Sequence, residues 1–151
     1  MKDNSSDLES VQMEMQPGVL TLEGFLGTDS RSLAEIVQAD DAEVQRLGLT
    51  HERIAERLTQ LTQMALQGFG TPQKGDEFSV VCSEAIGGWV RCPFRDKGRF
   101  RKGEIVLTDK NSGRMLTWTP LSVHLIEEHG FYQGRGSHYR LEPSLLKEML
   151  F

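Results

Sequence analysis

The segment EIVLTDKNSGRMLTW, residues 104–118, decides the fold of this chain. It holds two runs in which apolar and polar residues alternate, separated by a polar KNSG turn that ends in glycine. Antiparallel pairing across that turn places the apolar residues of both runs on one face. The four residues of this face form two facing pairs, Leu107 with Leu116 and Ile105 with Trp118. The segment therefore predicts a β-hairpin with one side in a hydrophobic core.

Helical patterns flank the predicted hairpin. Upstream, apolar residues recur at helical spacing over about 51–67, and Thr50 is placed to cap that helix. Downstream, Thr119-Pro120 and Pro143 each open a short helix. Alternating patterns near residues 78–83 and 89–94 add further strands. We therefore predict an α+β fold in which N-terminal helices pack on a small antiparallel sheet, finished by short C-terminal helices.

Charge is distributed unevenly along the chain. Its 151 residues carry a net charge of −5, with −7 in residues 1–69 and +2 in residues 70–151. We expect a flexible acidic tail over 1–17 and a single α+β domain over 18–151. Within that domain we expect an acidic helical part over about 28–69 and a mixed β/α part over about 71–151.

The composition excludes several protein classes. Hydrophobic residues make up 38% of the chain and charged residues 26%, which is typical of a small globular domain rather than a disordered chain. The sequence has no apolar run of 18 residues, so we expect no membrane association. The first residues are polar and do not resemble a signal peptide. We therefore expect a cytoplasmic protein of bacterial type, with Cys82 and Cys92 as thiols.

Basic residues cluster in two segments of the otherwise acidic chain. Residues 91–103 contain six basic side chains and a single acidic one, Asp96. Residues 134–140 form a glycine-rich loop with two arginines, which could direct N–H groups and positive charge at an anion. We expect these segments to bind an anionic partner, either nucleic acid or an acidic protein. The predicted binding residues are Arg91, Arg95, Lys97, Arg99, Arg101, Lys102, Gly134, Arg135, Gly136, Ser137, His138 and Arg140.

A metal site is the second hypothesis. Cys82, Cys92, His124 and His129 supply the donor types that zinc prefers, although their spacing fits no compact zinc finger. In this hypothesis the chain is a zinc-stabilised interaction module. The leading hypothesis requires no cofactor.

A third hypothesis is a small hydrolase or nuclease that uses His124, His129 and His138 as acid–base groups. The first two are five residues apart, whereas helical metallopeptidase motifs place their histidines four apart. No nucleophile motif is present either. We therefore favour a small non-catalytic binding or regulatory protein, whose acidic helices could also form a homodimer.

Overall fold

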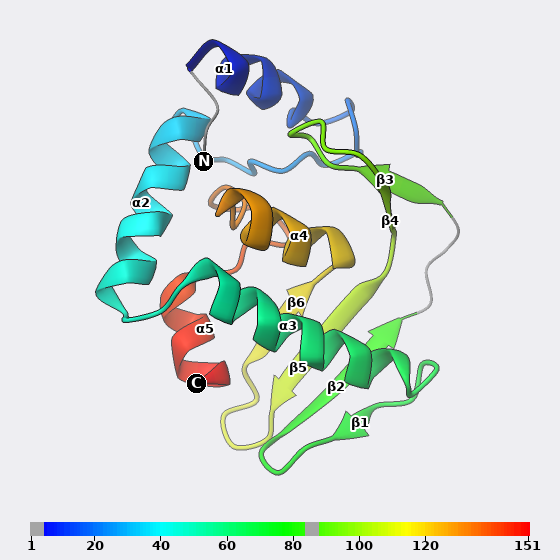
Figure 1. Ribbon diagram of the computed structural model, residues 1–151. Helices are drawn as coiled ribbons and strands as arrows, with labels where there is room; N and C mark the ends of the chain where they lie inside the picture. The colour runs from blue at the N-terminus through cyan, green and yellow to red at the C-terminus, as the bar shows by residue number, and fades with distance from the viewer. Residues whose placement is uncertain (1–4, 84–87) are drawn as a thin grey trace.

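The computed structural model describes residues 5–83 and 88–151, and these form an α+β fold (Figure 1). The helices are α1 (Ser5–Glu14), α2 (Leu33–Arg46), α3 (His51–Leu66), α4 (Pro120–His129) and α5 (Pro143–Leu150). The strands are β1 (Gln73–Lys74), β2 (Phe78–Ser83), β3 (Trp89–Arg91), β4 (Arg99–Arg101), β5 (Glu104–Asp109) and β6 (Met115–Trp118). Within the described ranges, no helix combines the length and hydrophobicity that crossing a bilayer would require.

The predicted hairpin is confirmed and forms part of the larger of two sheets. β5 pairs with β6 so that Leu107 faces Leu116 and Ile105 faces Trp118, and all four side chains are buried. This antiparallel sheet has the order β1-β2-β5-β6. β3 and β4 pair with each other in a separate two-stranded sheet. A strand at 89–94 was predicted; β3 itself ends at Arg91.

Helix α3 covers one face of the larger sheet, with α5 beside it (Figure 1). It begins at His51 after the Thr50 cap, whose side chain accepts a hydrogen bond from the Arg53 N–H, as the sequence predicted. Its buried face and the sheet enclose the first hydrophobic cluster. Trp118 lies fully buried in that cluster, and its indole N–H donates to the Thr62 hydroxyl over 2.8 Å. The hydrogen bond satisfies the one polar group of this large core side chain.

Helix α4 lies at the centre of the molecule and contributes side chains to two hydrophobic clusters (Figure 1). Ile126 faces the first cluster, whereas Leu121 and Leu125 belong to a second cluster that also contains Val90 and Phe94. The helix ends at His129 and is capped by Gly130, whose φ of +59° suits glycine better than any other residue. α4 therefore connects the main sheet to the β3–β4 hairpin.

The N-terminal segment differs from the predicted flexible tail. Residues 5–14 form α1, and Leu8, Val11 and Met15 are buried in the second cluster. The short helix is polar on most of its surface, so its apolar side chains did not stand out in the sequence. α2 is one continuous helix from Leu33 to Arg46, and it starts with a Ser32–Glu35 capping box.

Candidate metal centre

The turn after β3 brings two potential ligands to one side of the hairpin. Cys92 follows the last residue of β3 directly, and Asp96 lies four residues later. The Arg95 N–H donates to the Cys92 carbonyl over 3.0 Å, and Arg95 itself has a φ of +68°. This tight turn reverses the chain, so that the Asp96 carboxylate comes within 3.7 Å of the Cys92 sulfur.

The other two potential ligands come from α4. His124 Nε2 lies 2.8 Å from Asp96 Oδ2, and His129 Nε2 lies 2.5 Å from the same oxygen. The His129 Nε2 atom is also 3.7 Å from the Cys92 sulfur. One ligand atom from each of the four residues lies within 4.8 Å of every other. Two segments far apart in the sequence therefore converge on one point.

Aromatic rings hold both imidazoles in place. Phe94 stacks on His129 with a 4.0 Å separation of ring centroids and an angle of 7° between the planes. Phe100 packs against His124 at 4.6 Å. Phe94 in turn makes an edge contact with Phe131. The structure thus places Phe94 and Phe100 around the histidine pair.

Burial and charge act in opposite directions on the acidic groups of the cluster. Burial raises the pKa of the Cys92 thiol to about 11, and the neighbouring Asp96 charge also raises it. Burial alone would also raise the pKa of Asp96, but hydrogen bonds and charge from His129 and His124 outweigh it and lower that pKa below its usual value. The carboxylate is thus ionised at neutral pH, whereas the thiol must lose a proton before it can bind a metal.

The donor set fits zinc. Thiolate, imidazole and carboxylate are its three common protein ligands, and four of them complete a tetrahedral shell. In such a shell, neighbouring ligand atoms are roughly 3.3–3.5 Å apart, given Zn–N and Zn–S bonds of about 2.0–2.3 Å. The sulfur distances of 3.7 Å are close to this, and the His124 and His129 contacts to Asp96 would lengthen by less than about 1 Å.

Three of the four residues predicted as metal ligands lie in this cluster, and Cys82 does not. Cys82 lies on β2 opposite Ile105, and its thiol donates to the neighbouring Ser83 carbonyl. The fourth donor is Asp96, which was not among the predicted ligands. Its one distinguishing signal was its position as the only acidic residue among six basic ones in residues 91–103.

The predicted basic residues fall into two groups. Arg91, Arg99 and Arg101 are exposed on the β3–β4 hairpin, and Lys97 and Lys102 are exposed beside it. Arg95 instead binds α1, through Glu14 Oε1 at 3.2 Å and the Ser10 hydroxyl at 2.6 Å. The Arg140 side chain, 9% exposed, lies between Asp40 and Glu142. The positive charges of these two arginines are therefore compensated within the fold.

The glycine-rich loop packs against the segment that precedes α2. The Gly134 N–H donates to the Phe25 carbonyl, the Arg135 N–H to Asp29, and the Ser137 N–H to the Gly134 carbonyl. A Cβ atom on Gly134 would lie 2.2 Å from the Leu26 carbonyl oxygen, so close backbone approach requires glycine there. At least three of the N–H groups proposed to bind an anion thus already have partners in the fold.

A cavity of about 490 Å³ does bring parts of the two basic segments together. Arg101 and Lys102 lie on its lining, as do Ser137 and His138. His138 is also 4.0 Å from Glu104, and it is not a member of the metal cluster. The three histidines of the hydrolase hypothesis therefore do not form one group.

His51, the fourth histidine, is not among the residues predicted from the sequence to form a site. Its ring bridges Asp41 and the Tyr132 hydroxyl, each over 2.9 Å. Comparisons with known proteins add no assignment for any of these residues. No protein-family model, curated protein or solved structure matches the chain.

Proposed function

We propose that this chain is a zinc-binding module in which the metal joins the β3–β4 hairpin to helix α4. The observation that carries the proposal is the convergence of one sulfur, one carboxylate oxygen and two imidazole nitrogens within 4.8 Å. Cys92 and Asp96 come from the hairpin turn, and His124 and His129 come from the helix. Such a site connects two elements that are separate in the sequence.

A structural role for the metal is favoured over a catalytic one. Catalytic zinc sites keep one coordination position for water or substrate, whereas four protein ligands leave none open in a tetrahedral shell. Cys92 is buried, and Phe94 and Phe100 flank the two histidines. These contacts support a closed site that contributes to folding.

The metal content of selected variants tests the proposal. We expect about one zinc ion per chain in the wild-type protein, measured by elemental analysis after dialysis against metal-free buffer. Cys92→Ser and His129→Gln should lose stoichiometric zinc because each removes a ligand. Cys82→Ser and His138→Gln are the matched controls and should retain it, since neither residue belongs to the cluster. A metal-free wild type, or equal loss in the controls, contradicts the proposal.

Zinc affinity should also rise with pH. Burial raises the pKa of Cys92 to about 11, so below that pH the metal must displace a proton from the thiol. This displacement predicts about a tenfold gain in affinity per pH unit from Cys92 alone, between about pH 7 and 9. Competition with a chromophoric chelator measures the dependence. The variant Cys92→Asp keeps a ligand but supplies a carboxylate, so its slope should be smaller by about one. An equal slope in both proteins would show that Cys92 does not bind the metal.

A further inference from the structure

We propose that the outer face of the β3–β4 hairpin binds single-stranded nucleic acid. This outer face consists of Trp89, Arg91, Arg99 and Arg101. It is separate from the metal centre and relates to the zinc proposal only in that zinc would hold the hairpin in place.

The strand register creates this face. Trp89 pairs with Arg101, and Arg91 pairs with Arg99, so these four side chains lie on the same side of the hairpin. The pair between them, Val90 and Phe100, points to the opposite side, toward the second hydrophobic cluster. The hairpin therefore has an apolar inner face and an outer face made of one indole and three guanidinium groups.

The charges of the outer face are not compensated by the residues that the structure describes. Across 5–83 and 88–151, no carboxylate forms an ion pair with Arg91, Arg99 or Arg101. Arg95 and Arg140, from the same predicted basic set, each bind a carboxylate. Arg99 and Arg101 are alternate residues of β4, about 7 Å apart, and Arg91 lies across the hairpin from Arg99, so the three arginines form a cluster of cations. Such a cluster suits the negative charges of a phosphate backbone.

Trp89 identifies the partner more sharply than the charges do. Trp89 is 49% exposed, and the Arg99 and Arg101 guanidinium groups lie 5.3 and 5.4 Å from its ring centroid. These contacts hold the indole on the surface. An aromatic ring among cations can stack on an unpaired base while the cations bind the adjoining phosphates. An acidic peptide would use the charges but not the ring, and a duplex would keep its bases stacked inside.

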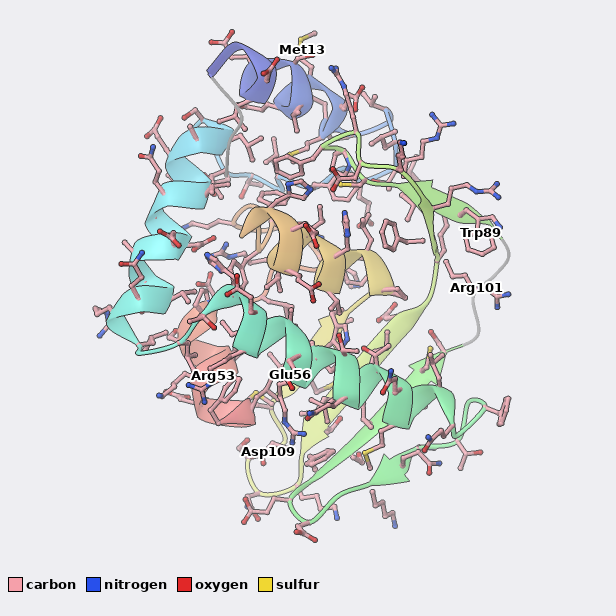
Figure 2. The ribbon with its side chains drawn as sticks, in the orientation of Figure 1. Met13, Arg53, Glu56, Trp89, Arg101 and Asp109 are labelled. Atoms are coloured by element: carbon pink, nitrogen blue, oxygen red, sulfur yellow. The ribbon has the colours of Figure 1, made fainter. Side chains whose placement is uncertain are left out.

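The labelled residues in Figure 2 supply a matched control for the outer face. Trp89 and Arg101 lie at one edge of the molecule, and Arg53 on α3 lies well away from them (Figure 2). Arg53 is exposed and packs over the ring of Phe151 at 5.4 Å, much as Arg99 packs over Trp89 at 5.3 Å. Arg53→Ala and Arg99→Ala thus remove the same kind of contact at two separate places.

Fluorescence anisotropy of zinc-loaded full-length chain tests the proposal with four labelled probes. These are oligo-dT and oligo-U of about 15 nucleotides, the duplex of the DNA probe, and a poly-glutamate peptide. We expect both single strands to bind more tightly than the duplex or the peptide. Arg99→Ala should reduce the slope of log affinity against log salt by about 0.7, whereas Arg53→Ala should leave it unchanged. Trp89→Ala should weaken single-strand binding about tenfold, and Trp89→Phe should restore most of it.

Zinc content, measured on every variant, separates this proposal from the previous one. If zinc is bound but neither single strand binds, or if Arg53→Ala and Arg99→Ala weaken binding equally, the nucleic-acid proposal is wrong. Equal or tighter binding of poly-glutamate identifies an acidic protein as the partner and also overturns it. Hairpin-dependent binding by a chain that takes up no zinc would instead contradict the zinc proposal alone.

Discussion

Removal of zinc with a chelator should lower the free energy of unfolding by about 4 kcal/mol, relative to protein in zinc at about a thousand times its Kd. The reason is that only the folded chain brings the four ligands together, so the binding free energy of the metal adds to the stability of the fold. Denaturant unfolding followed by circular dichroism, with and without chelator, measures the change.

The loss of stability should be greatest where the β3–β4 hairpin packs on α4. The second hydrophobic cluster contains Val90, Cys92 and Phe94 from the hairpin, and Leu121 and Leu125 from α4. The metal would tie these two groups together, whereas the cluster between α3 and the larger sheet contains none of the four candidate ligands. Removal of zinc should therefore increase the rate of amide hydrogen exchange more in the β3–β4 hairpin than in β5.

Two comparisons make this prediction specific. His129→Gln should already have the low stability of the chelated wild type and should not respond to chelator, because it lacks a ligand. His138→Gln should respond as the wild type does. If chelation shifts the unfolding transition of His129→Gln as much as that of the wild type, the stabilising metal binds elsewhere.

The fold could be predicted largely from local patterns. Alternation over residues 104–118 determines which side chains share a face, and the short turn allows only a few registers. The α3 boundaries followed from its apolar stripe and its Thr50 cap. α1 was missed because its stability comes from tertiary contacts of Leu8 and Val11, which a short polar helix does not reveal in sequence.

The candidate metal site was predictable only in part. Cysteine and histidine are few in this chain, so their chemistry alone drew attention to Cys92, His124 and His129. Aspartates and glutamates number 22, and nothing local distinguishes a ligand among them apart from charge context. Cys82 was included for the same chemical reason. In the structure Cys82 lies on β2 of the larger sheet, whereas Cys92 directly follows β3 of the two-stranded sheet, so the fold separates the two cysteines.

The use of the glycine-rich loop, residues 134–140, was also not predictable from local sequence. Glycine and arginine at residues 134–140 are typical of an anion site, but they serve packing equally well. Which use applies depends on residues distant in sequence, such as Leu26 against Gly134 and Asp40 against Arg140. A sequence pattern can single out such glycines and arginines. Their role becomes clear only when the residues that they contact in the folded chain are known.

Arg140→Ala should destabilise the fold by about 3–5 kcal/mol. The side chains of Arg140 and Asp40 are only 9% and 7% exposed, and two guanidinium nitrogens of Arg140 bind the two carboxylate oxygens of Asp40. A third contact runs to the Gln133 carbonyl, over 2.8 Å. Burial alone would lower the pKa of Arg140, but the hydrogen bonds of Asp40 and Glu142 outweigh it and raise that pKa. Removal of the arginine would leave the Asp40 carboxylate buried without its partner.

The control is an arginine whose ion pair is also short but is exposed to solvent. Arg114 lies 2.7 Å from Glu148, and their side chains are 48% and 61% exposed. Arg114→Ala should therefore cost less than about 1 kcal/mol in the same denaturant titration. The double variant Asp40→Asn with Arg140→Gln should lose less stability than the sum of its single variants, because each single variant leaves one buried charge without its partner and the double variant removes both charges. Strict additivity would contradict a direct interaction. A loss after Arg140→Ala no larger than after Arg114→Ala would show that Arg140 is free for a partner, as the sequence first suggested.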